Sequence, residues 1–141
     1  MTVFHTVLFD LDGTLVDAFQ TIHRAYAHVL PQLGLPAPTP AEVRAAVGGG
    51  LESAMRRFVP APLLAEALRR HTAYSAEILL EETVLMPGAA GLLSALHAGG
   101  IACAVLTNKH GEVARCLCAH LGHAPFLRGV FGAGDTPWLS P

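Results

Sequence analysis

The chain has 141 residues, a formal net charge of −2 and only 14% charged residues. Without a dense basic run this charge balance argues against a nucleic-acid partner, and no apolar run reaches the ~18 residues of a membrane span. The first residues lack the features of a signal peptide, and the 3 cysteines show no CxxC spacing. We therefore expect a cytoplasmic protein with reduced thiols, consisting of one domain or of a small core with an insert.

The first predicted element is an apolar strand that runs directly into two acidic residues. Residues 4–9 are followed by Asp10 and Asp12, whose side chains leave the same face if the extended geometry persists. Ligands of open α/β sheets bind at the carboxyl ends of the strands, and Gly13 permits a sharp turn that would bring backbone N–H groups near the acids. A hairpin turn at Asp12 and Gly13 is the structural alternative.

Two crowded carboxylates are tolerable when a cation or a shared proton lies between them. Mg²⁺ suits this position because it accepts one or two carboxylates and completes its shell with water and phosphate oxygens. One carboxylate can then attack phosphorus to form an aspartyl-phosphate, while the other transfers protons. The pattern therefore indicates phosphoryl transfer.

The next residues are helical in their pattern. Apolar side chains at alternating spacings of three and four predict the first helix, and a capping box with proline at the first helical position, Thr39–Glu42, predicts the start of the second. The expected helices cover residues 19–33, 40–47, 51–59 and 62–82.

A triple glycine, residues 48–50, separates two of these helices. Gly49, Gly50 and Arg56 are candidates for binding a small anionic ligand. A plain break between helices is the favoured alternative, since three glycines suit loop geometry equally well.

A helix over residues 88–100, with Leu92, Leu93 and Leu96 on one face, is expected to precede a buried strand over residues 101–109. A helix followed by a strand is half of a right-handed crossover. Thr107, at the end of that strand, should therefore lie at the same edge of the sheet as Asp10.

One further cluster has potential metal ligands, namely Cys116, Cys118, His120 and His123. Three of these follow helical spacing. We do not favour a zinc site, because structural zinc sites draw paired ligands from two separated segments.

The segment Asp10-Leu11-Asp12-Gly13-Thr14-Leu15-Val16-Asp17 resembles the first motif of the haloacid dehalogenase superfamily in its phosphatase form, D-x-D-G-T-L-x-D. The resemblance implies that Asp10 is the nucleophile and Asp12 the general acid/base. It also implies that both residues bind Mg²⁺, Asp12 through its backbone carbonyl.

The resemblance extends to the end of the second strand. Thr107 and Asn108 are similar to the second motif of the superfamily, which supplies a hydroxyl to the transferring phosphoryl group. Together with Gly13 and Thr14 they form the predicted phosphate-binding set.

The fold implied by the resemblance is α/β, with a Rossmann-like three-layer core around a parallel sheet and an all-α helical cap inserted after the first strand. The expected core covers residues 1–15 and 84–141, and the cap covers residues 16–83. The implied function is a Mg²⁺-dependent phosphatase acting on a small phosphorylated metabolite. 2-Phosphoglycolate leads because the phosphoglycolate phosphatase type pairs this motif with a cap of this size. A phosphosugar mutase and a catalytically inactive fragment or binding and assembly module are the alternatives.

The chain departs from the superfamily near its last residue. Ser140 and Pro141 stand where the third motif has Lys-Pro, no fourth G-D-x-x-x-D motif follows, and Asp135 has no acidic partner behind it. The composition also suggests missing polar surface. The chain is 52% hydrophobic and only 14% charged, whereas about 25% charged residues is usual in soluble domains. We expect an incomplete sheet whose exposed edge favours self-association, with weak Mg²⁺ binding and little turnover.

Overall fold

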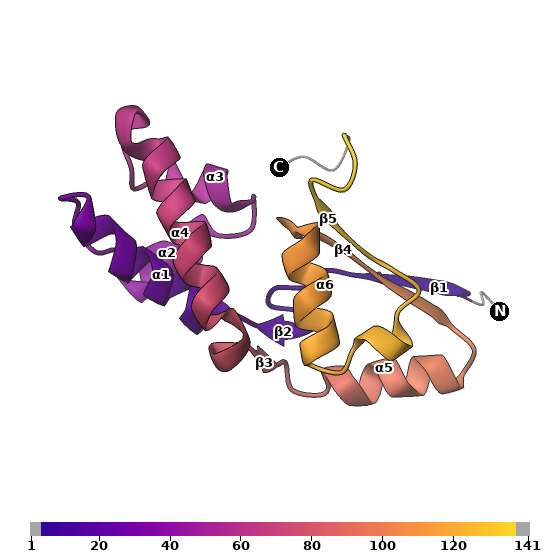
Figure 1. The fold of residues 1–141 in the computed structure, drawn as a ribbon. Helices are drawn as coiled ribbons and strands as arrows, with labels where there is room; N and C mark the ends of the chain where they lie inside the picture. The colour runs from indigo at the N-terminus through magenta and orange to yellow at the C-terminus, as the bar shows by residue number, and fades with distance from the viewer. Residues whose placement is uncertain (1–3, 138–141) are drawn as a thin grey trace. The chain divides into compact units, whose positions relative to one another are not determined.

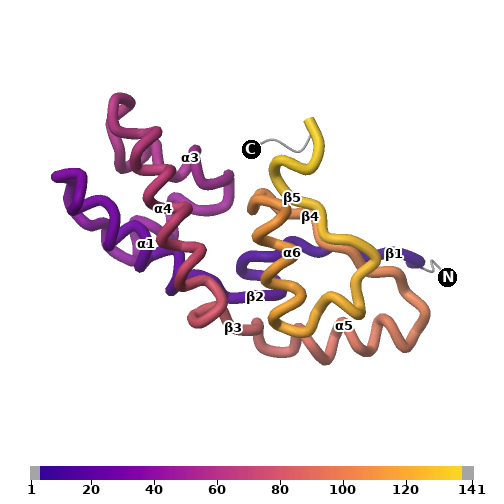
Figure 2. Tube along the Cα trace, viewed as in Figure 1, coloured from indigo at the N-terminus to yellow at the C-terminus, as the bar shows by residue number. Residues whose placement is uncertain are grey.

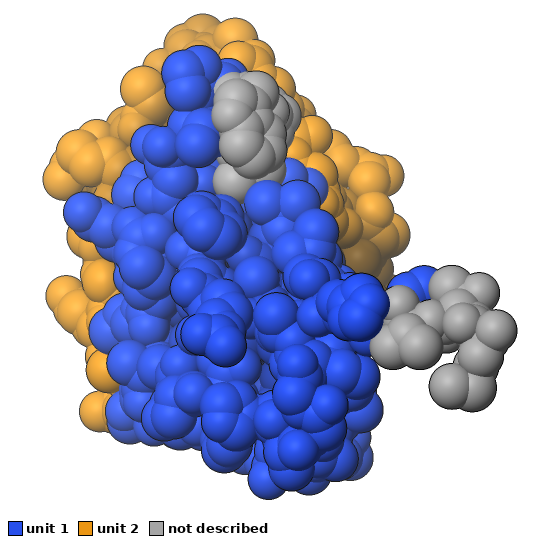
Figure 3. Space-filling model, turned by 90° about the vertical axis from the view of Figure 1, so that its right-hand side faces the viewer, with its two compact units in different colours: residues 1–17, 84–140 blue, residues 18–83, 141 orange. Residues whose placement is uncertain are grey.

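The computed structural model describes residues 4–137, which form two compact units. One unit, the core unit, contains residues 4–17 and 84–137, and the other, the helical unit, contains residues 18–83 (Figures 1, 2 and 3). Each unit is described by itself below.

The core unit is built on a three-stranded parallel sheet in the order β1-β4-β5. Strand β1 (Thr6–Phe9) pairs with β4 (Ala102–His110), which pairs in turn with β5 (Val130–Ala133). Thr6 lies opposite Ala102, and Phe9 lies opposite Val105. The prediction of an α/β fold with a parallel sheet is confirmed, and the hairpin alternative for β1 is wrong.

Helices α5 (Ala89–Ala98) and α6 (Gly111–His120) pack on this sheet, α5 against β4 and α6 against β4 and β5. A short 3₁₀ helix, η1 (Ala124–Phe126), follows α6. The expectation that Leu92 shares the buried face of α5 with Leu93 is wrong, because Leu93 is fully buried whereas Leu92 is 48% exposed. Adjacent helical residues point about 100° apart, and the face that α5 turns to the sheet includes Leu93 but not Leu92.

A two-stranded antiparallel sheet marks where the chain leaves and re-enters the core unit. Strand β2 (Val16–Asp17) pairs with β3 (Val84–Leu85), with Val16 opposite Leu85 and Asp17 opposite Val84. Val16 and Asp17, which we expected at the start of the insert, therefore pair with residues of the core unit.

The helical unit consists of α1 (Phe19–Gln32), α2 (Pro40–Ala46), α3 (Leu51–Met55) and α4 (Ala61–Glu82). The capping box of α2 is confirmed, since the Glu42 N–H donates to the Thr39 hydroxyl and the Glu42 carboxylate accepts from the Thr39 N–H. Helix α3 is shorter than expected. The N–H groups of Arg57 and Phe58 turn back to carbonyls only three residues earlier, so the helix does not continue to residue 59.

Tyr26 lies at the centre of the apolar core of the helical unit. Its ring makes edge contacts with Phe58 at 5.4 Å and His71 at 4.7 Å between centroids, and burial raises the pKa of its phenol to about 12. The buried residues around it come from all four helices and from the segment after α3: Val29, Leu30, Val43, Ala46, Ala54, Met55, Val59, Leu64 and Ala67. Because burying apolar area is the main stabilising term in folding, the helical unit has a core of its own.

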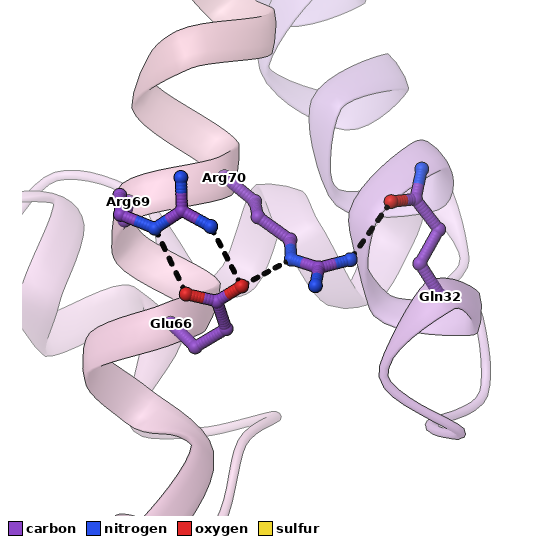
Figure 4. A network of polar contacts seen from close by, with 4 residues as sticks. All are labelled: Gln32, Glu66, Arg69 and Arg70. Atoms are coloured by element: carbon purple, nitrogen blue, oxygen red, sulfur yellow. Dashed lines mark hydrogen bonds and ion pairs between the residues drawn. The ribbon is translucent and has the colours of Figure 1, made fainter.

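A polar network on the surface of the helical unit joins α4 to α1 (Figure 4). The Glu66 carboxylate accepts from Arg69 and Arg70, and Arg70 also donates to the Gln32 side chain. Hydrogen bonds from Arg69 and then Arg70 lower the pKa of Glu66 to about 2. Exposed ion pairs of this kind stabilise a protein only slightly. The packing around Tyr26 therefore contributes more to the stability of the helical unit than this network does.

In the described part of the chain, β1 and β5 are the two edge strands of the core sheet, and one face of the sheet exposes apolar side chains. Strand β1 pairs only with β4, and Leu8, Leu106 and Phe131 are 63%, 37% and 48% exposed. Their register places these side chains on the same face. No charged residue or proline interrupts β1, and these are the usual means of blocking edge-to-edge pairing. Self-association stays a prediction, now with a defined surface.

Replacing Leu8 with Lys should reduce self-association, because a lysine on an edge strand opposes pairing with another chain. Light scattering after size-exclusion chromatography measures the shift toward monomer. Leu92→Lys is the matched control, since Leu92 is exposed on α5 and should leave the mass unchanged. A wild-type chain that stays monomeric at high concentration would contradict the prediction.

Candidate functional site

The two acids of the first motif lie in a tight loop directly after β1. Asp10 is exposed, and its Oδ1 accepts the Leu11 N–H at 2.7 Å. Gly13 adopts a φ of +78°, a conformation that favours glycine. Its N–H donates to the Val16 carbonyl, while the Thr14 N–H donates to Leu11. These backbone amides are thus already hydrogen-bonded, and the phosphate role of Gly13 and Thr14 stays a prediction.

Asp12 contacts the end of the neighbouring strand. Its Oδ2 lies 3.1 Å from the Nζ of Lys109, and these side chains are only 33% and 14% exposed. Its Oδ1 is buried and has no hydrogen-bond partner among the described residues. Asp12 therefore combines one ion-paired oxygen with one unsatisfied oxygen.

The end of β4, whose register with β5 shifts between Leu106 and His110, carries the second motif. Thr107 is buried, and its Oγ1 accepts the Lys109 N–H at 3.1 Å. Its own hydroxyl proton can still be donated to another oxygen, while Asn108 is exposed. The parallel register of β1 and β4 places the end of β4 and the acids at the carboxyl ends of neighbouring strands.

The end of β4 is held against β5 by close backbone packing. A Cβ atom on Gly132 would collide with the Lys109 carbonyl and with Gly111, and one on Gly111 would collide with the Asp135 carboxylate. Asp135 in turn accepts from the Gly132 N–H at 2.8 Å and binds Arg115 of α6 through both oxygens. Arg115 first, and then Gly132, lower the pKa of Asp135. Asp135, to which sequence reasoning gave no role, thus holds the β5 end against α6.

The donor set near the first motif fits Mg²⁺. A buried carboxylate oxygen without a partner is costly, and carboxylate oxygen is the ligand that Mg²⁺ prefers. No group of three or more His, Cys, Asp or Glu side chains gathers within residues 4–137. The described residues therefore offer the Asp10 carboxylate, the Asp12 backbone carbonyl that the resemblance implies, and the unpartnered Asp12 Oδ1. Water and phosphate oxygens would complete the shell.

The other candidate residues lie elsewhere. Gly50 precedes α3 with a φ of +93°, and the exposed Arg56 is ion-paired with Glu52. The anion role of Gly49, Gly50 and Arg56 stays a prediction, with Arg56 already holding a counter-charge. In the cysteine and histidine cluster, Cys118 and His123 are buried while Cys116 and His120 are exposed. Ser140 and Pro141, where the third motif would lie, are outside the described residues.

Sequence reasoning missed Lys109, whose ammonium lies beside Asp12. A signal was available, because Lys109 is the only lysine in the chain and follows Thr107 and Asn108 directly.

In the part of the chain that the structure describes, no helix has the length and apolarity to cross a membrane. Cys103, Cys116 and Cys118 are all free thiols.

Comparison with known proteins matches this arrangement to one family. The profile described as "Haloacid dehalogenase-like hydrolase" matches residues 7–137. The phosphoglycolate phosphatases of Caulobacter vibrioides and Yersinia pseudotuberculosis are 34% and 31% identical to the chain over 96% of its length. The chain spans 60% and 61% of the length of these two relatives.

Solved structures give the same match. A predicted phosphoglycolate phosphatase from Haemophilus somnus aligns with a TM-score of 0.91 and 25% identity, covering 100% of this chain and 68% of that one. A haloacid dehalogenase-like family hydrolase from Streptococcus pneumoniae aligns with a TM-score of 0.87 and 28% identity, covering 94% and 62%. The Rossmann-like α/β fold expected from the first motif is confirmed.

Replacing Arg115 with Met should lower the stability of the core unit at neutral pH, because Asp135 loses its guanidinium partner. A carboxyl group whose pKa is lowered on folding stabilises the fold above its unfolded pKa, and this contribution is lost as pH falls through the folded value. The difference between variant and wild type should therefore shrink below the ordinary Asp value of 3.8.

Denaturant unfolding followed by circular dichroism at neutral pH and at about pH 3.5 measures this change. Arg128→Met, which removes an exposed cation at the start of β5, should show no such pH dependence. An Arg115 effect of equal size at both pH values would contradict the role of the ion pair.

Proposed function

The chain belongs to the haloacid dehalogenase-like hydrolase family, and we propose that it hydrolyses a small phosphomonoester, with 2-phosphoglycolate as the leading substrate. The relatives named phosphoglycolate phosphatase support this substrate. The chain spans about 60% of the length of these relatives. The proposed activity therefore refers to an enzyme of the relatives' length that contains these residues. A cytoplasmic location is proposed with it.

The observation that carries the proposal is the pairing of β1 with β4. It brings the loop with two carboxylates, the buried Thr107 hydroxyl and the Lys109 ammonium together at the carboxyl ends of neighbouring strands. Parallel sheets of this kind bind ligands at the carboxyl ends of their strands. A phosphate ester presented there would meet a nucleophile, a proton donor and hydrogen-bond donors together.

In the proposed reaction an Asp10 carboxylate oxygen attacks phosphorus, and the bond from phosphorus to the ester oxygen breaks. Asp12 gives its proton to the leaving alkoxide, which departs as an alcohol. In the second step Asp12 takes a proton from water, the water oxygen attacks phosphorus, and the bond to Asp10 breaks to release inorganic phosphate. Mg²⁺ held by Asp10 and Asp12 would neutralise the charge on the phosphoryl oxygens.

In a chain completed to the length of the relatives, Asp10→Asn should abolish phosphate release from 2-phosphoglycolate, because an amide does not attack phosphorus. Asp12→Asn should lower the rate by roughly 10²–10⁴-fold, the usual contribution of proton transfer. A colorimetric phosphate assay in the presence of Mg²⁺ measures both, with the Caulobacter vibrioides relative as positive control. Glu77→Gln, at an exposed carboxylate of the helical unit, should retain the wild-type rate. Substantial turnover by the Asp10 variant would refute the assignment.

A phosphatase and a mutase differ in the acceptor that meets the phosphorylated Asp10. With 2-phosphoglycolate we expect stoichiometric release of inorganic phosphate, because water is the acceptor. ³¹P NMR follows the substrate and the product in one sample. Isomerisation of a hexose 1-phosphate without phosphate release would favour the mutase instead.

A further inference from the structure

We propose that Lys109 is a phosphate-binding residue of this site, and that its ammonium pairs with Asp12 until a phosphate group arrives. The inference deepens the proposed function and rests on it for the identity of the ligand. Lys109 is the one lysine of the chain, and the two motifs that the chain shares with the superfamily assign no role to it.

The first argument is the burial of the Lys109 side chain. It is only 14% exposed, and its Nζ lies 3.1 Å from Asp12 Oδ2. An ammonium group loses much of its hydration on burial and needs an anionic partner to offset this cost. Asp12 meets that need when no phosphate is bound, and a phosphate dianion beside Asp12 would meet it more fully.

The second argument is charge balance at the acids. Asp10, Asp12 and a phosphate dianion would repel one another unless a cation lies among them. The other Lys and Arg side chains in the described residues of the core unit are placed differently. Arg115 is bound to Asp135, and Arg128 is exposed near the amino end of the sheet, where its N–H donates to the Cys103 carbonyl. Among the described Lys and Arg side chains of the core unit, Lys109 is the one that contacts an acid of the first motif.

The third argument is the fixed position of the end of β4. The Lys109 N–H is bound to the Thr107 hydroxyl oxygen, and Gly132 packs directly on the Lys109 carbonyl. The Thr107 hydroxyl and the Lys109 ammonium thus belong to one strand end whose backbone is held in place. Preorganised donors of this kind lose little entropy when they bind an anion.

The single lysine makes a direct test possible in the unmodified sequence. Reductive methylation with ¹³C-formaldehyde labels Lys109 and the α-amino group, and it keeps the positive charge of the lysine. Lys109→Met identifies the ¹³C NMR signal of the methylated lysine, because this signal is absent from the variant. We expect this signal to shift in Asp12→Asn, and to shift in the wild type when inorganic phosphate is added without metal.

The same experiment separates phosphate binding from a purely structural ion pair. A signal that responds to Asp12→Asn but not to phosphate would show that Lys109 only neutralises Asp12, and would overturn the proposal. A signal that responds to neither would overturn the contact itself. This readout needs no turnover, so it also separates the Lys109 proposal from the proposed function. If Asp10 were not the nucleophile, the Lys109 signal should still shift on addition of phosphate.

Calorimetric titration with inorganic phosphate gives the size of the effect. Lys109→Met should weaken binding by about tenfold or more, the range expected for one charged hydrogen bond. Lys109→Arg should restore part of the affinity, and Arg128→Met should bind as the wild type does. Equal phosphate affinity in Lys109→Met and the wild type would contradict the role of Lys109.

Discussion

The parallel pairing of β1 with β4 is the constraint on which the site depends. The two strands pair over four positions, from Thr6 opposite Ala102 to Phe9 opposite Val105, although the whole helical unit lies between them in the chain. Shifting the register by one residue would turn every side chain to the opposite face. It would also move Asp12 relative to Lys109, and the 3.1 Å ion pair would not form.

A second set of contacts fixes the end of β4. Arg115 of α6 holds the Asp135 carboxylate, which also accepts the Gly132 N–H, and the close packing of Gly111 and Gly132 leaves no room for a side chain. These contacts do not touch the acids. They position the end of β4, which carries Thr107 and Lys109, so glycines and an ion pair outside the loop of the acids contribute to the site.

The helical unit depends on a different interaction. Its apolar residues gather around Tyr26, and its surface network joins α4 to α1 through Glu66 and Arg70. Both sets of contacts lie within residues 18–83. The helical unit therefore has an apolar core and a polar network of its own.

The sequence alone determined the features that depend on near neighbours. Two acids two residues apart after an apolar strand, the capping box at Thr39 and the Thr107-Asn108 pair are all local patterns. The fold class was implied by the resemblance of the first and last of these patterns to the superfamily's motifs. The tertiary structure decided which distant groups meet. Asp12 reaches Lys109, and Arg115 reaches Asp135, only through strand register and helix packing. Likewise, Leu92 is exposed because α5 turns only one face to the sheet. No local pattern encodes such contacts, because they arise from side chains far apart in sequence that the folded backbone brings within hydrogen-bond distance.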